Sequence, residues 1–126
     1  MKSILTLAAS LVLVSCSTIA PPAARGSVDH VVFVWLKRPG NPTDRQAVIA
    51  ASNELCVIPG IKFLDSGTAL ASDRPVVDDS FDIGMTMRFD SAESLRAYES
   101  HPRHVQKVTE VLKPLSKKIV VYDIIR

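Results

Sequence analysis

The stretch Val28–Lys37, VDHVVFVWLK, decides the fold of this 126-residue chain. It is rich in β-branched and aromatic residues, which predicts a β-strand. Side chains alternate across a strand, so one face carries His30, Val32, Val34 and Leu36, and the other carries Val31, Phe33 and Trp35. Because both faces are apolar, we expect both to be covered.

The residues that follow predict an alternation of helices and strands. Thr43 and Gln46 have the spacing of a capping box, and a helical apolar stripe follows as far as Pro59-Gly60. Strands are predicted over residues 61–68, 81–89 and 117–125. A second helical region opens at Ser91, is interrupted at His101-Pro102 and ends at Pro114. The order β-α-β-β-α-β predicts an α+β, ferredoxin-like fold with a four-stranded antiparallel sheet and helices on one face.

One face of the predicted sheet has no element left to cover it. It carries Phe33, Trp35, Val120, Tyr122 and Ile124. Apolar surfaces of this kind mark interfaces, and two-fold dimers are the commonest oligomers. The sequence therefore predicts a homodimer through this sheet face.

The N-terminus has the layout of an export signal. Lys2 precedes the apolar stretch Ile4–Val14, which is too short to span a bilayer as a helix. The tetrapeptide Leu13-Val14-Ser15-Cys16 resembles the lipobox of bacterial lipoproteins. That resemblance implies a signal peptide over residues 1–15 and diacylglycerol on the Cys16 sulfur. The alternative is an ordinary signal peptide in which Cys16 is incidental.

Residues 16–27 then form an anchor and tether, and residues 28–126 form the domain. This organisation predicts an exported, membrane-anchored bacterial lipoprotein that faces the periplasm or lies on the cell surface. Lipid on Cys16 would provide the membrane attachment. Cys56 is expected to be a buried, unreactive thiol.

Charge and motifs exclude several classes of protein. The chain has 15 basic and 13 acidic residues. Removing residues 1–15 removes only Lys2, so 14 basic against 13 acidic residues leave a net charge of +1. Scattered basic residues and a small net charge do not predict nucleic-acid binding. A phosphate-binding glycine loop, a serine nucleophile elbow and a CxxC motif are absent from the sequence, so no cofactor is expected. His30, His101 and His104 are only a weak candidate metal set, and no metal is expected.

Three residues are candidates for catalysis. His104 continues the stripe of Val108 and Leu112, so it should point toward the sheet, where His30 could meet it. Tyr98, on the inner face of the preceding helix, could reach the same place. A histidine can take a proton near neutral pH and a tyrosine can donate to a developing enolate. Candidate ligand-binding residues are His30, Val32, Val34, Met85, Tyr98, His101, His104 and Val121.

Structural roles would explain the same residues. His101 could cap the next helix, and Tyr98 could belong to the core. A backbone carbonyl or Asp123 could satisfy His104. Three functions therefore stay open: a pocket for a small apolar or carbonyl-bearing molecule, a cofactor-free lyase or cyclase, and a purely structural dimer module.

Four strings carry a family resemblance: His30-Val31-Val32, Phe89-Asp90-Ser91, Tyr98-Glu99-Ser100-His101-Pro102-Arg103-His104-Val105 and Val121-Tyr122-Asp123. With them the domain resembles the Dabb family of stress-responsive proteins. The resemblance implies a dimeric α/β barrel in which two sheets face each other and the helices lie outside.

The resemblance also implies site residues. One plant member of the family is a polyketide cyclase that closes a poly-β-keto chain by aldol condensation without a cofactor. Its catalytic tyrosine and histidine fall on Tyr98 and His104, and a pocket histidine falls on His30. The plant enzyme has aromatic residues in its first helix, whereas this chain offers Val48, Ile49 and Ala51.

Overall fold

A computed structural model describes residues 19–20 and 22–126. The predicted signal peptide and Cys16 lie outside the described residues. The elements, in chain order, are β1 (Val28–Leu36), α1 (Pro42–Asn53), the 3₁₀ turn η1 (Glu54–Val57), β2 (Ile61–Gly67), β3 (Ile83–Phe89), α2 (Ala92–Glu99), α3 (Pro102–Lys107), the π turn η2 (Val108–Leu112), α4 (Lys113–Leu115) and β4 (Ser116–Ile125). Within the described part of the chain, no helix has the length and apolar character needed to cross a membrane.

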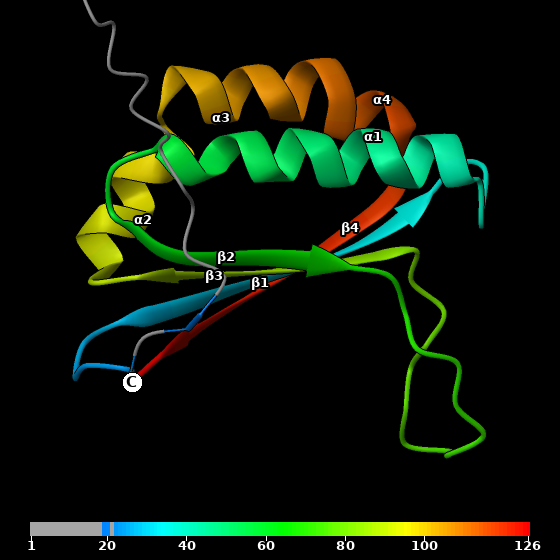
Figure 1. The fold of residues 1–126 in the computed structure, drawn as a ribbon, viewed down its shortest axis with the longest axis horizontal. Helices are drawn as coiled ribbons and strands as arrows, with labels where there is room; N and C mark the ends of the chain where they lie inside the picture. Colours follow the sequence, from blue (N-terminus) through cyan, green and yellow to red (C-terminus); the bar gives the residue numbers. More distant parts are fainter. Residues whose placement is uncertain (1–18, 21) are drawn as a thin grey trace, which may run out of the picture.

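The four strands form one antiparallel sheet in the order β2-β3-β1-β4. The helices form a second layer on one face of this sheet, and the long β2–β3 connection extends away on the other side (Figure 1). The predicted ferredoxin-like α+β fold is confirmed. Strand β1 lies in the middle of the sheet, and its register pairs His30 with Met87 of β3 and with Asp123 of β4.

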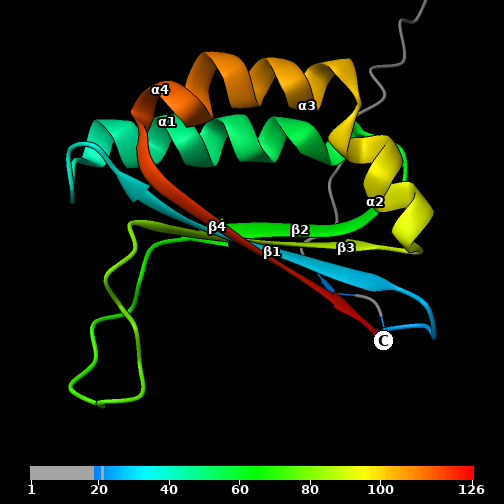
Figure 2. The same cartoon turned by 180° about the vertical axis from the view of Figure 1, so that it is seen from behind.

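The alternation predicted for β1 separates a buried face from a partly open one. His30, Val32, Val34 and Leu36 are all buried beneath the helices, together with Ile83, Met85, Met87 and Phe89 of β3. Val31, Phe33 and Trp35 lie on the other face and are half-buried. Figure 2, which shows the molecule from behind, shows no helix over that second face. Tyr122 and Ile124 of β4 are 57% and 50% exposed there.

A buried carboxylate fixes the connection from β1 to α1. Asp82 accepts hydrogen bonds from the backbone N–H groups of Leu36 (2.9 Å) and Gly40 (2.7 Å), and it pairs with Arg45 (3.0 Å). Burial opposes the ionised form, but these hydrogen bonds outweigh it and lower the pKa of Asp82. Gly40 has a φ of 73°, which is favourable for glycine.

Both helical regions differ in detail from the prediction. Helix α1 begins at Pro42, with the Asn41 side chain as its cap, so the capping box expected at Thr43 is wrong. Asparagine is a strong N-cap, and proline suits the first helical position that follows it.

The break at His101-Pro102 is present, but Pro114 lies inside the last helical turn instead of ending the region. The Lys113 N–H reaches back five residues to the Val108 carbonyl, which makes the π turn. Proline has no N–H to donate, so a helix that contains Pro114 must rearrange its hydrogen bonds locally.

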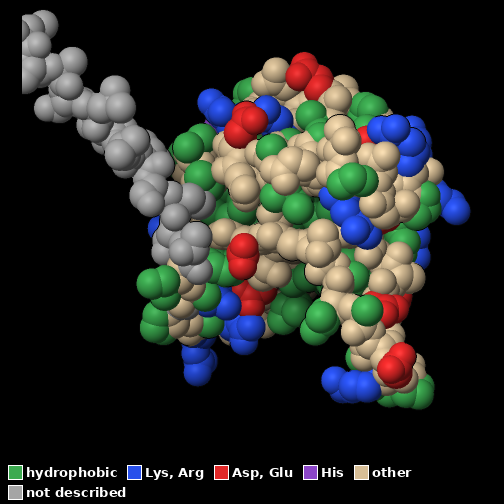
Figure 3. Space-filling view, turned by 45° about the vertical axis from the view of Figure 1, so that its right-hand side comes forward, with side chains coloured by type: hydrophobic (Ala, Val, Ile, Leu, Met, Phe, Trp, Pro, Cys, Tyr) green, Lys and Arg blue, Asp and Glu red, His purple; other side chains and the backbone are tan. Residues whose placement is uncertain are grey.

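Basic and acidic side chains are interspersed on the face of the molecule shown in Figure 3. Neither the basic nor the acidic side chains form an extended patch on this face. Residues Leu70 and Val76 of the projecting β2–β3 connection are 87% and 84% exposed.

Candidate functional site

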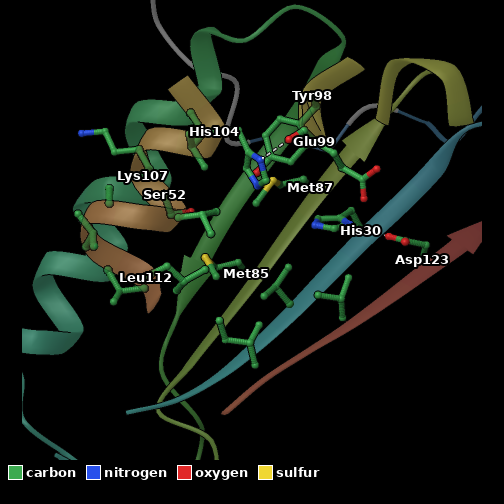
Figure 4. A pocket seen from close by; sticks show the side chains of 18 residues that line it. His30, Ser52, Met85, Met87, Tyr98, Glu99, His104, Lys107, Leu112 and Asp123 are labelled. Carbon is green, nitrogen blue, oxygen red and sulfur yellow. Dashed lines mark hydrogen bonds and ion pairs between the residues drawn. The ribbon is translucent and has the colours of Figure 1, made fainter. Parts of the chain in front are cut away.

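A cavity of about 400 Å³ lies between the helices and the covered face of the sheet (Figure 4). Its floor comes from β1, β3 and β4, and its roof from α1, α3 and the π turn η2. Most of the lining is aliphatic, with the two thioethers Met85 and Met87. Ile119 and Val121 line it from β4 and are 36% and 46% exposed, so the cavity opens along this edge strand.

Six of the eight predicted ligand-binding residues line the cavity: His30, Val32, Met85, Tyr98, His104 and Val121. Two do not. Val34 points the same way as Val32 but is fully covered by core side chains. His101 caps α3, where its Nδ1 accepts a hydrogen bond from the Arg103 N–H at 3.2 Å. Including Val34 and His101 was wrong, and the capping alternative describes His101.

His30 is held by a partner on the neighbouring strand. Its Nδ1 lies 2.6 Å from Oδ1 of Asp123, which is directly opposite in the β1–β4 register. His30 is 6% exposed, whereas the Asp123 side chain is 45% exposed, so the contact is buried on the histidine side and open to solvent on the carboxylate side. A carboxylate accepts only, so Nδ1 carries the proton in this pair when the imidazole is neutral. Nε2 then keeps its lone pair on the side of the ring away from Asp123.

His104 has the same tautomer through a different partner. Its Nδ1 donates to the Glu99 carbonyl oxygen at 2.9 Å, because a carbonyl can only accept. Of the two partners considered from the sequence, the backbone carbonyl is therefore correct and Asp123 is wrong. Burial lowers the pKa of His104, so the imidazole is neutral at pH 7 and Nε2 is unprotonated.

Tyr98 connects the two histidines. Its ring centroid is 4.4 Å from that of His104 and 6.0 Å from that of His30. Tyr98 is 1% exposed, and burial, with a smaller contribution from Glu99, raises the pKa of its hydroxyl. The phenol therefore stays protonated and remains a hydrogen-bond donor at all physiological pH values. The close-up view shows the side chains of His30, Tyr98 and His104 at one end of the cavity (Figure 4).

Sequence reasoning did not assign four polar lining residues to the site: Ser52, Glu99, Lys107 and Asp123. Glu99 holds His104 through its backbone carbonyl. Asp123 positions His30, and a signal for it was available, because an acidic residue interrupts the apolar strand β4. Lys107 lies at the cavity with its Nζ 2.5 Å from Glu54 Oε2. Ser52 follows Val48 by one helical turn on the apolar face of α1. Its spacing could have identified it as inward-facing.

Metal ligands do not gather at this site. No group of three or more histidine, cysteine, aspartate or glutamate side chains within the described residues could hold a metal ion. His101 lies outside the cavity lining, which leaves His30 and His104 as the two histidines there.

Together, this fold and site define a class: ferredoxin-like α+β proteins with an apolar cavity beneath the helices and a His–Tyr–His cluster at one end. The chain belongs to the Dabb family, described as the stress responsive A/B barrel domain, whose model matches residues 28–126. The predicted family is thus confirmed. No curated protein matches the sequence.

Solved structures share the fold at low sequence identity. A Dabb protein with a ferredoxin-like fold from Mesorhizobium loti has a TM-score of 0.66 and 23% identity, covering 81% of this chain and 98% of its own. A hydroxynitrile lyase from Passiflora edulis has a TM-score of 0.70 and 24% identity, and the match covers 82% of this chain and 95% of the lyase. A dimeric ferredoxin-like protein of unknown function from Thermobifida fusca has a TM-score of 0.64 and 21% identity, and the match covers 79% of this chain and 91% of that protein.

Proposed function

We propose that the domain binds a small apolar molecule bearing a carbonyl group in the cavity beneath its helices. The observation that carries this proposal is an apolar cavity of about 400 Å³ whose polar atoms converge at His30, Tyr98 and His104. Small-molecule pockets have this composition and volumes of about 300–1,000 Å³. A purely structural module would instead fill such a space with side chains.

The polar end of the cavity offers complementary groups. The Tyr98 hydroxyl is a protonated donor and suits a carbonyl oxygen, which only accepts. The Nε2 lone pair of His104 suits a hydroxyl or an acidic C–H next to the carbonyl. The aliphatic walls bind the apolar body of the ligand through burial of its surface.

A second candidate function is a cofactor-free lyase or cyclase. The observation that favours it is a neutral His104 beside a protonated Tyr98, with ring centroids 4.4 Å apart. His104 Nε2 would take a proton from the carbon next to the carbonyl, and Tyr98 would stabilise the enolate oxygen. The hydroxynitrile lyase among the structural relatives shows that proteins of this fold can carry lyase activity.

We also propose that two copies of the domain pair through the uncovered sheet face. Phe33, Trp35, Val120, Tyr122 and Ile124 lie on that face, and Phe33 packs against both Phe81 and Tyr122. Structural relatives from Thermobifida fusca and Bacteroides fragilis are dimeric. Sheet-to-sheet packing would give the dimeric α/β barrel implied by the family resemblance and would remove exposed apolar surface from water.

The membrane anchor is a proposal from the sequence. The lipobox-like Leu13-Val14-Ser15-Cys16 supports lipidation of Cys16 after cleavage of residues 1–15, with the domain outside the cytoplasm. Several acyl chains on one residue anchor a protein stably, because each buried CH₂ contributes about 0.8 kcal/mol.

Filling the cavity should abolish binding. Ala51→Phe places a large ring in the cavity lining, and Ala50→Phe places the same ring on the exposed side of α1. With acetophenone as the probe, isothermal titration calorimetry should show affinity reduced about tenfold or more in Ala51→Phe alone. Equal affinities in the two variants would contradict binding in this cavity, provided that circular dichroism shows both to be folded.

Proton abstraction should depend on His104 and on pH. In D₂O the wild type should accelerate exchange of the acetophenone methyl protons, and NMR would follow the loss of signal. The rate should rise as His104 loses its proton, with a midpoint below about pH 6.5, and stay flat through pH 7. His104→Ala should remove the acceleration, whereas His101→Ala, outside the cavity, should keep it. Full acceleration in His104→Ala would rule out the lyase function.

A charge on the uncovered sheet face should separate the dimer. Trp35→Asp and the more exposed Tyr122→Asp should elute with the mass of one chain in size-exclusion chromatography with light scattering, because an unpaired buried carboxylate is costly. Val57→Asp introduces the same charge at a residue that is 47% exposed on η1 and should stay dimeric. A dimeric, folded Tyr122→Asp would disprove this packing.

Lipidation should require Cys16. In a bacterial host supplied with a radiolabelled fatty acid, the full chain should incorporate label and sediment with membranes, and Cys16→Ser should do neither. Cys56→Ser is the matched control and should behave as the wild type. Membrane association of Cys16→Ser equal to that of the wild type would reject the anchor.

A further inference from the structure

A second hollow, of about 370 Å³, lies on the uncovered face of the sheet, where β2 and β3 run side by side. Thr86 in its lining pairs with Val31 of β1, which lies on that face. The rings of Phe63 and Phe81 and the carboxylate of Asp65 also line it. The helices cover the opposite face (Figure 2), so this hollow is separate from the cavity beneath them.

Two glycines keep the hollow open. Gly67 of β2 and Gly84 of β3 are directly paired in the register. Neither has a positive φ, so the backbone does not require glycine at either position. Beyond its chain neighbours, a Cβ at Gly67 would meet no atom within 4 Å, and one at Gly84 would make ordinary contacts, the nearest with Phe81 at 3.4 Å. Glycine weakens a strand and often marks a close approach by another molecule or backbone, so we expect an occupant here.

The same face has protruding side chains at its other edge. Tyr122 and Ile124 of β4 are 57% and 50% exposed. Tyr122 pairs with Val31 of β1, which pairs in turn with Thr86 of β3. Thr86 pairs with Asp65 of β2. Tyr122 and the hollow therefore lie at the same level along the strands, at opposite edges of one face.

Two-fold symmetry can bring the protrusion and the hollow together. When two copies of the sheet face each other about an axis along the strands, β4 of each copy lies opposite β2 of the other. Facing sheets lie about 10 Å apart with strand directions within about 30°, so residues at one level meet and their side chains interdigitate. An axis across the strands would instead place Tyr122 against its own copy and leave both hollows empty, which close-packed interfaces avoid.

We propose that the ring of Tyr122 from a second copy of this chain fills the hollow between β2 and β3. This inference rests on the proposed pairing of two sheets and specifies which residues meet. A two-fold interface uses the same surface on both copies, so each dimer contains this contact twice. The hollow is thus one half of a self-complementary surface, and the second copy completes it.

The lining suits a tyrosine side chain. Phe63 and Phe81 supply aromatic rings, and pairs of aromatic rings pack favourably. Asp65 Oδ1 accepts from the Ser66 N–H at 2.8 Å, and a carboxylate has further acceptor positions. The hydroxyl of Tyr122 can therefore donate to Asp65. A hydrogen bond from a phenol to a carboxylate is stronger than one between neutral groups.

The first test fills the hollow and then removes the incoming ring. By analytical ultracentrifugation of the full chain, Gly67→Phe should raise the dimer dissociation constant about tenfold or more, because its ring occupies the hollow. Gly67→Ala is the matched control and should stay within about threefold of the wild type. Gly67→Phe combined with Tyr122→Ala should dimerise more tightly than Gly67→Phe alone, because the new ring replaces the one removed. Absence of this recovery would contradict a direct contact.

A double-mutant cycle tests the hydrogen bond without filling the hollow. Tyr122→Phe should raise the dissociation constant about 10–100-fold, because each dimer loses two bonds worth about 3–10-fold each. Asp65→Ala should have a similar effect, and the double variant should be no weaker than either single one. Asp73→Ala removes a carboxylate outside the hollow and should change nothing. Effects that simply multiply in the double variant would overturn the contact between Tyr122 and Asp65.

The outcomes separate this inference from the proposed sheet pairing. A wild type that stays monomeric, or a folded Tyr122→Asp variant that stays dimeric, overturns the pairing, and the inference falls with it. A wild-type dimer that Tyr122→Asp dissociates, but that is as tight in Gly67→Phe as in Gly67→Ala, leaves the pairing standing. That result would overturn the occupation of the hollow by Tyr122.

Discussion

The register between β1 and β4 is the constraint on which the site depends. It pairs His30 with Asp123 on the covered face of the sheet, and the two side chains meet at 2.6 Å. A slip of one residue would turn Asp123 to the uncovered face and bring Tyr122 or Ile124 opposite His30. His30 would then lose the carboxylate that fixes its tautomer. A slip of β1 itself would expose the apolar residues on its covered face, such as Val32 and Val34, and their burial opposes it.

Much of this arrangement could be predicted from the sequence. The alternation in β1, the helix break at Pro102 and the inward direction of His104 all follow from local periodicity. The error at Val34 has a different origin: alternation assigns a side chain to a face but does not say whether a cavity or other side chains cover it. His101 was misassigned because Pro102 starts a helix there, and its imidazole is in place to cap it.

The cavity exists because of side-chain size and helix geometry. Helix α1 presents Ala51 and Ser52 toward the sheet, where larger residues would fill the space. The second helical region is divided at Pro102 and again by the π turn, which places Val108, Val111 and Leu112 on the cavity wall. No periodic pattern in the sequence marks an empty volume between the helices and the sheet, and none marks a π turn. The residues around the cavity could therefore be found from the sequence, but the cavity itself could not.

Several features of the site lower the stability of the domain. An unfilled apolar volume gives up packing contacts, Ser52 buries an unpaired hydroxyl, and burial makes it harder to protonate His104. With a pKa lowered on folding, His104 binds protons more readily when unfolded, so its effect on stability turns unfavourable as the pH falls below about 6.5. The ion pairs of the buried carboxylates Asp29 and Asp82, which do not line the cavity, lower the pKa of both carboxyls and stabilise the fold above about pH 4. On β1, an outward-facing carboxylate that stabilises the fold, Asp29, thus lies next to an inward-facing residue of the site, His30.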